Sequence, residues 1–202
     1  IYENNGGSWT KLDQDIDGEA VNDYSGTSVS LSSDGNTVAI GAYGNDGNGF
    51  DAGHVRIYEN NGGSWTQVGQ DIDGEAVNDQ SGRSVSISSD GSTVAIGAVA
   101  NDGSGTNAGH VRIYENIGGS WTKVDQDIDG EAAGDYSGYS VSLSSDGSIV
   151  AIGAYNNDGN GSGAGHVRIY ENNGGSWTQV GQDIDGEAAY EFSGVSVSLS
   201  SN

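Results

Sequence analysis

The sequence predicts an all-β protein built from β-propeller blades of four antiparallel strands. Three observations favour this class. A segment that begins "IYENNGGSWT" at Ile1 returns with a fixed period of 56 residues, each period holds four short runs of alternating apolar and polar residues, and Gly- and Asn-rich turns separate the runs. A fixed period of this length is typical of propellers, solenoids and arrays, and alternation with a period of two is typical of strands. With three full periods and 34 residues of a fourth, about 3.6 repeats are present.

The first complete period contains the four expected strands in chain order. Valine, isoleucine, leucine or tyrosine alternates with small or polar residues in each of them. We expect these strands over 28–32, 37–41, 54–58 and 65–68. Asp34-Gly35 joins the first two as a tight hairpin, in which we expect positive φ at both residues. Residues 60–64, which read Asn-Asn-Gly-Gly-Ser, join the last two. A four-stranded sheet of about fifty residues corresponds to one propeller blade.

The two faces of each predicted sheet differ in side-chain size. Leu, Ile, Val and Phe make up less than a fifth of the chain, a composition that by itself indicates disorder. The register of the repeat argues against disorder, because the same valine returns in the first strand of every period: Val29, Val85, Val141 and Val197. Serine, threonine, alanine and glycine occupy the opposite face. We therefore expect the bulky face of one blade to pack against the slim face of the next.

The chain is predicted to form a single repeat domain over residues 1–202. It starts with the last two strands of a partial blade, continues with three whole blades, and ends in the first strand of another partial blade. The predicted boundaries are 1–26, 27–82, 83–138, 139–194 and 195–202. Unpaired sheet edges recruit other strands. We therefore expect the partners to be further copies of the chain, forming a ring or a filament, or the remaining blades of a longer parent chain.

Charge and composition exclude several classes of partner. The formal net charge is −23 with only six basic residues, whereas nucleic-acid binding and attachment to anionic membranes both need basic clusters. No apolar run is long enough for membrane insertion. Cysteine is absent, so a thiolate metal site is excluded. Divalent cations are the natural counter-charge for such an acidic chain.

The candidate metal site has the D-x-D-x-D-G pattern of a calcium loop. It occurs in the first and third periods, and its candidate ligands are Asp13, Asp15, Asp17, Glu19, Asp125, Asp127, Asp129 and Glu131. In the second and fourth periods Gly69 and Gly181 replace the first aspartate. The competing interpretation, which we favour, is an outer strand whose acidic face is solvated and which ends in a glycine turn.

Aromatic and histidine residues also recur once per period. The tryptophans of "GGSWT" are either packing anchors, which we favour, or exposed platforms for ligand binding by sugar stacking: Trp9, Trp65, Trp121 and Trp177. The histidine of "GHVR", first seen as His54, is expected to be a hydrogen-bonded structural residue. The neighbouring arginine, first seen as Arg56, is expected to pair with acidic residues of an adjacent strand or blade.

The run Ser25-Gly26-Thr27-Ser28-Val29, through Asp34-Gly35, to Val38–Ala42 resembles the FG-GAP repeat, the blade unit of integrin α-chain propellers and of many secreted microbial proteins. The pattern recurs at 81–98 and 137–154, and in part at 193–201. The resemblance implies an extracellular or cell-surface location and a calcium loop between the first two strands. Calcium needs six to eight oxygen ligands, and "SLSSDGNT" offers a single carboxylate. A plain hairpin turn is therefore favoured at this point.

These observations predict a non-enzymatic extracellular propeller for adhesion or scaffolding, with Ca²⁺ as its candidate cofactor and an extracellular protein or glycan as its candidate ligand. Two alternatives stay open. One is a lectin-like module with a weak carbohydrate site in each blade, which gains strength from multivalency. The other is a structural subunit of an extracellular filament assembled through unpaired blade strands. The sequence has no nucleophile elbow, His-Glu-x-x-His or P-loop motif, so no catalytic residue is assigned.

Overall fold

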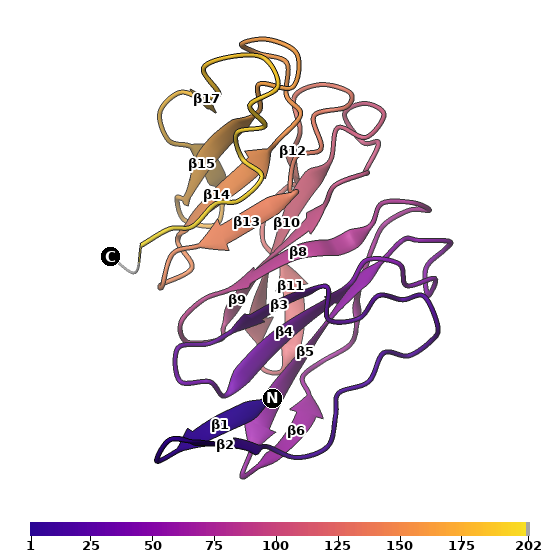
Figure 1. Cartoon of the computed structure of the whole chain (residues 1–202), viewed down its shortest axis with the longest axis vertical. Helices are drawn as coiled ribbons and strands as arrows, with labels where there is room; N and C mark the ends of the chain where they lie inside the picture. The colour runs from indigo at the N-terminus through magenta and orange to yellow at the C-terminus, as the bar shows by residue number, and fades with distance from the viewer. Residues whose placement is uncertain (201–202) are drawn as a thin grey trace.

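The computed structural model describes residues 1–200, and consists of short strands joined by turns. Within these residues no helix has the length and apolar character needed to cross a bilayer. The N-terminal hairpin of β1 (Tyr2–Asn5) and β2 (Ser8–Lys11) lies at one end of the molecule, and three larger sheets follow along its longest axis in chain order (Figure 1). This arrangement confirms the predicted all-β class of stacked antiparallel blades.

Each large sheet contains four antiparallel strands in chain order and a fifth, two-residue strand paired with the third. The first sheet consists of β3 (Ser28–Leu31), β4 (Thr37–Ala42), β5 (His54–Asn61), β6 (Ser64–Gln67) and β7 (Ile72–Asp73). The second consists of β8 (Ser81–Ile87), β9 (Thr93–Ala98), β10 (His110–Ile117), β11 (Ser120–Lys123) and β12 (Ile128–Asp129). The third consists of β13 (Ser140–Leu143), β14 (Ile149–Ala154), β15 (His166–Asn172), β16 (Trp177–Gln179) and β17 (Ile184–Asp185).

The core lies between neighbouring sheets and has one bulky side and one slim side. Val85 and Ile87 of β8 point toward the preceding sheet, where they join Ala39, Val55 and Ile57 in one buried cluster. The next interface repeats this packing with the equivalent residues of the second and third sheets. Burial of these aliphatic side chains is the main stabilising term of each interface, at about 25 cal/mol per Å² of apolar surface removed from water.

Serine side chains tie the first strands of adjacent sheets together. Ser28 Oγ donates a 2.7 Å hydrogen bond to the Gly82 carbonyl oxygen, and Ser30 Oγ accepts one of 3.1 Å from the Ile87 amide. Both bonds recur in the following repeats. Serine therefore occupies the slim face because a small hydroxyl lets the backbones approach and bonds the neighbouring strand.

The two ends of the stack show how much each sheet depends on its neighbour. Val29 is 62% exposed, whereas its equivalent in the second sheet, Val85, is 8% exposed. At the other end, the sequence predicted a strand over 195–202, and the structure differs: residues 195–200 form no strand. The segment still follows the stack, since the Leu199 amide donates to Ser142 Oγ at 3.0 Å. It lacks strand geometry because no neighbouring strand in residues 1–200 pairs with it. Residues 201 and 202 of this predicted partial blade lie outside the described residues.

The hairpin between β3 and β4 is wider than predicted. Of its two central residues only Gly35 has positive φ, at 73°, so the expected two-residue turn is wrong. Asp34 instead closes a longer loop, because its carboxylate accepts hydrogen bonds from Ser32 Oγ at 2.7 Å and from the Asn36 amide at 2.9 Å. These bonds hold the pKa of the Asp34 carboxyl below its ordinary value. The Asp34 carboxylate therefore stabilises the turn through these hydrogen bonds.

Candidate functional site

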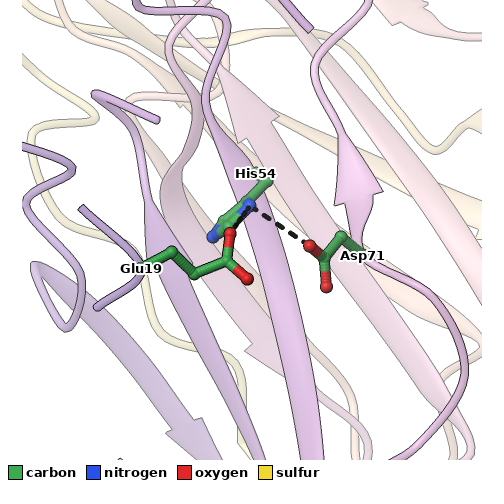
Figure 2. A group of neighbouring side chains, drawn as sticks. All are labelled: Glu19, His54 and Asp71. Carbon is green, nitrogen blue, oxygen red and sulfur yellow. Dashed lines mark ion pairs between the residues drawn. The ribbon is translucent and has the colours of Figure 1, made fainter. Parts of the chain in front are cut away.

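A histidine side chain lies between two carboxylates at each blade interface. His54 is the first residue of β5 and lies opposite Asp73 of the short strand β7. Its imidazole is 1% exposed, and its Nδ1 atom lies 3.9 Å from Glu19 Oε2 and 3.8 Å from Asp71 Oδ2 (Figure 2). Glu19 comes from the preceding repeat, whereas Asp71 follows β6. The group therefore joins two successive repeats.

This constellation is present three times within residues 1–200. In each copy a histidine and two carboxylates place potential ligand atoms within 4.8 Å of one another, and the three groups are Glu19–His54–Asp71, Glu75–His110–Asp127 and Glu131–His166–Asp183. The third copy has one more carboxylate close by, because Asp185 Oδ1 lies 4.0 Å from His166 Nδ1. Such a donor set is suited to a divalent cation.

A buried arginine positions the glutamate of each group. Arg56 Nη2 donates to the Asp17 carbonyl oxygen at 2.7 Å, and its Nη1 lies 3.7 Å from Glu19 Oε1. Arg112 and Arg168 make the equivalent contacts in the following repeats. The expected pairing of this arginine with an acidic residue of a neighbouring blade is confirmed. One glutamate oxygen thus faces the arginine and the other faces the histidine.

Burial favours the neutral form of the three histidines, and the structure corrects their predicted hydrogen bonding. Burial lowers the pKa of His54 and His166, and lowers that of His110 to about 4. In none of the three does Nε2 have a hydrogen-bond partner among the described residues. The expectation of a hydrogen-bonded structural histidine was wrong, because Nε2 is buried without a partner in residues 1–200 and Nδ1 lies 3.8–4.0 Å from the nearest carboxylate oxygens, too far for a hydrogen bond.

The first aspartate of the predicted calcium loop has a backbone role. Asp13 has a φ of 60°, and Gly69 has a φ of 75° at the same place in the next repeat. Asp and Gly tolerate this left-handed conformation better than most residues, which explains their alternation there. The Asp13 carboxylate accepts a hydrogen bond from the Trp65 amide at 3.0 Å, and Asp125 accepts one from the Trp177 amide at 2.8 Å.

The remaining carboxylates of each predicted loop point to different partners. Asp15 pairs with Lys11 at 2.8 Å, and Asp127 pairs with Lys123 at 2.7 Å. The backbone carbonyl oxygen of Asp17 accepts a hydrogen bond from Arg56. Asp129 lies on β12 opposite His110. Within residues 1–200 the four carboxylates of one loop do not form a single group. Three of the eight candidates, Glu19, Asp127 and Glu131, belong to histidine-centred groups instead.

The tryptophans lie mainly at blade interfaces. Trp121 packs against the cluster that contains Val85 and donates from Nε1 to the Val68 carbonyl oxygen at 3.0 Å. Trp65 and Trp177 pack against equivalent clusters. Trp9 differs, since it is 69% exposed. The indole rings of the three full blades therefore cover the core.

A second surface was missed in the sequence. It consists of aromatic side chains and one arginine at the ends of the first two strands of each sheet, and we call it the tyrosine–arginine surface: Tyr24, Tyr43, Arg83, Tyr136, Tyr139, Tyr155 and Phe192. Tyr24 stacks on Tyr43 with ring centroids 5.0 Å apart, and Tyr139 and Tyr155 are 4.5 Å apart. The guanidinium of Arg83 lies over Tyr43 and Tyr139, at 5.5 and 4.9 Å from the ring centroids.

Arg83 differs from the other basic residues in its partners. Lys11, Arg56, Arg112, Lys123 and Arg168 each have a carboxylate within 4.0 Å. Within residues 1–200, Arg83 has none, and its recorded contacts are aromatic, including the Tyr139 hydroxyl at 3.4 Å. A β-bulge between Ser81 and Ser84 places Arg83 at this edge of β8. In so acidic a chain, a cation without an acidic partner is free to receive an anionic group.

The near-identical repeats diverge at this surface, which was the signal available in the sequence. The position of Arg83 holds threonine, arginine, tyrosine and valine in successive repeats, and the position of Tyr43 holds tyrosine, valine and tyrosine. By contrast, the histidine, the arginine of the blade interface and the turn aspartate are the same in every full repeat. The residues of the blade interface therefore recur in every full repeat, whereas the tyrosine–arginine surface is one of the places where the repeats differ.

Comparisons with known proteins support the repeat unit and the fold. The sequence model described as FG-GAP repeat matches residues 16–58 and 128–170. A search of curated proteins gives no match. Among solved structures, the chain is similar to Sqt1 of Saccharomyces cerevisiae, with 13% identity, 81% of this chain and 36% of that chain covered, and a TM-score of 0.52.

A second solved structure, the hydrazine synthase of Kuenenia stuttgartiensis, is 11% identical over 89% of this chain and 41% of that chain, with a TM-score of 0.50. The chain thus spans well under half the length of both proteins, and at these identities the similarity shows the fold alone. The strand order, the blade interfaces and the two matched segments agree with one another. The chain therefore contains FG-GAP repeats, matched over residues 16–58 and 128–170, and its sheets stack as the blades of a β-propeller.

Proposed function

We propose that the chain is a non-enzymatic, extracellular propeller module for adhesion or scaffolding, and that it holds its ligand at the tyrosine–arginine surface. The observation that carries the proposal is the position of Arg83, between two tyrosine rings and without a carboxylate partner in residues 1–200. Tyrosine and arginine are enriched in the central residues of protein interfaces. The repeats also differ in sequence at this surface, which is compatible with a ligand site that is not repeated in every blade.

Charge defines the kind of partner that fits. The net charge of −23 favours a partner with a basic surface and speeds the encounter between the two. Arg83 then offers a single site for a carboxylate of that partner. An extracellular protein that presents an acidic side chain within a basic surface satisfies both conditions.

The blades themselves supply substitutions that suit the fold. Arg83→Thr installs the residue found at the same place in the first repeat, Thr27, and Tyr43→Val installs the residue of the second repeat, Val99. Phe50→Ser is the matched control, because Phe50 is an exposed loop residue whose equivalent in the third full repeat is Ser162.

The experiment is binding of the whole chain to an array of extracellular matrix proteins and to a glycan array. We expect a protein ligand whose binding is weakened at least tenfold by Arg83→Thr and by Tyr43→Val, and unchanged by Phe50→Ser. Binding confined to glycans would favour the lectin alternative instead. Binding that none of the three substitutions alters would contradict the assigned surface.

A specific observation favours self-association as a second candidate function. Val29 and Leu31 of β3 are 62% and 50% exposed, while the equivalent residues of the later sheets lie in the interfaces. Another copy of the chain, or a further blade of a longer chain, could cover this face. Analytical ultracentrifugation tests it: a wild-type assembly that becomes monomeric in Val29→Ser/Leu31→Ser supports association, and a wild-type monomer at high concentration contradicts it.

A further inference from the structure

We propose that the groups around His54 and His166 each bind a first-row transition-metal dication of the Zn²⁺ type, which bridges two successive repeats. The ligands are the imidazole Nδ1, the glutamate of the preceding repeat and the aspartate that follows the fourth strand of the same blade. This inference does not depend on the proposed adhesive function.

The separations within each group suit a shared ion. Nδ1 lies 3.9 and 3.8 Å from its two carboxylate oxygens at His54, and 3.8 Å from both at His166. These distances are too long for hydrogen bonds. An ion that takes bonds of about 2.0–2.2 Å to nitrogen and oxygen fits between donors at this spacing after shifts of a few tenths of an ångström.

The third group shows an unpartnered donor atom aimed at the site. The His166 side chain is 1% exposed, and its Nδ1 is buried without a hydrogen-bond partner. Three carboxylates face this atom, from Glu131, Asp183 and Asp185. A buried polar atom without a partner is costly, and a coordinated cation would satisfy it while neutralising the carboxylates.

The donor chemistry favours a transition metal over calcium. Imidazole nitrogen suits Zn²⁺ and related first-row ions, whereas calcium takes six to eight oxygen ligands. Arg56 contacts the second oxygen of Glu19 and so fixes the orientation of that carboxylate.

The middle group is the weakest of the three, for two reasons. At the outer groups a neutral amide holds the second oxygen of the aspartate, since Gln67 donates to Asp71 Oδ1 and Gln179 to Asp183 Oδ1, both at 2.6 Å. At the middle group Lys123 takes this place and pairs with Asp127 at 2.7 Å. The positive charge of Lys123 repels a metal cation that approaches the same aspartate. His110 also has a single carboxylate within 4.0 Å of Nδ1, that of Asp127.

The experiment is calorimetric titration of the chelator-treated whole chain with ZnCl₂, and in parallel with CaCl₂. We expect two tight zinc sites and a weaker third one, and a rise in Tm with zinc that equal calcium does not produce. His54→Gln/His166→Gln should abolish the two tight sites. Lys123→Gln should strengthen the third site at least tenfold, because it recreates the outer groups.

Two further results keep the test decisive. If the histidine variant loses its fold, Glu19→Gln/Glu131→Gln replaces it, since these carboxylates are half exposed and each should weaken its site at least tenfold. Circular dichroism verifies the fold of every variant. Absence of saturable zinc binding, or binding that persists unchanged in folded histidine and glutamate variants, would overturn the proposal and assign any bound zinc to scattered surface carboxylates.

Discussion

Ser84 Oγ donates a 2.7 Å hydrogen bond to the carbonyl oxygen of Gly138, which lies two residues before the first strand of the next sheet. Ser28 and Ser140 make the same bond to Gly82 and Gly194. The bond sits where the backbones of two blades come closest, because a side chain on Gly97 would collide with the same Gly138 carbonyl. Close backbone approach and a serine hydroxyl together define the join between repeats.

Removing one of these hydroxyl groups should destabilise the stack measurably. Ser84→Ala leaves the Gly138 carbonyl without this donor in a partly buried place, and we expect a loss of about 1 kcal/mol in the free energy of unfolding. Urea denaturation measures the change. Ser64→Ala on the exposed strand β6 is the control, with an expected change within about 0.5 kcal/mol. Equal effects at both positions would argue against the interface bond.

A side chain placed where the backbones of two blades come closest should destabilise the fold far more than loss of the serine hydroxyl. Gly97→Ala would drive a methyl group into the backbone of Gly138, which cannot yield as a side chain can. We expect a loss of about 4 kcal/mol or more, or failure to fold. Gly118→Ala is the control: it meets no atom within 4 Å and adds only the strain of a φ of 63°, which costs about 1–2 kcal/mol. Thermal melts compare the two variants.

The repeat provides a matched pair for hydrophobic burial. Val85→Ala removes two methyl groups from a buried cluster and should cost about 2 kcal/mol. Val29→Ala is the same change at the equivalent position, but Val29 is 62% exposed, so its cost should stay below about 0.5 kcal/mol. The measurement is the free energy of unfolding of both variants, obtained by denaturation under conditions in which the chain is monomeric. Similar losses would mean that another surface covers Val29 or that Val85 is not in an interface.

The turn aspartates predict an acid-sensitive component of stability. Hydrogen bonds from serine hydroxyls and a backbone amide lower the pKa of Asp34 and Asp90, and lower that of Asp146 to about 2. A carboxyl group with a lowered pKa in the folded state contributes stability above its ordinary pKa of 3.8, and loses it as the pH falls through the folded value.

The variant that tests this component is Asp34→Asn/Asp90→Asn/Asp146→Asn, which keeps an acceptor at each turn without the charge. We expect the wild-type chain to be the more stable at pH 7, with a difference that shrinks as the pH falls from about 5 to 2. Melting temperatures at stepped pH provide the comparison. A difference independent of pH would mean that ionisation of these residues does not stabilise the turn.

The strands and their order were predictable because the same pattern occurs in three full periods and in part of a fourth. Val29 and its equivalents keep one register, and this periodicity by itself predicted which face each blade buries. The loop around Asp34 was predicted less well. An Asp-Gly pair is typical of tight hairpins, and in this chain hydrogen bonds from Ser32 and Asn36 to the Asp34 carboxylate stabilise a wider loop. Such side-chain bonds depend on local geometry that propensity does not contain.

The candidate sites were harder to predict because their members come from different repeats. Glu19 and His54 are 35 residues apart in the chain, and Asp71 lies further on. A linear pattern such as D-x-D-x-D-G groups residues by proximity in sequence, whereas the fold directs Asp13 to the Trp65 amide and Glu19 to His54. The short strand β7, which places Asp73 beside His54, was not predicted either, since two residues show no periodicity.

Site-resolved amide hydrogen exchange tests the stacking of the repeats most directly. The Ile87 and Leu143 amides donate to serine hydroxyls of the preceding blade, and the Ser89 amide donates to the Ser145 carbonyl of the following one at 2.8 Å. Because these bonds exist only between blades, the stacked arrangement predicts that all three amides exchange slowly, with protection comparable to that of the β9–β10 ladder. Exchange of these amides at free-peptide rates, while the ladder itself stays protected, would show separate sheets that do not stack and would contradict the propeller.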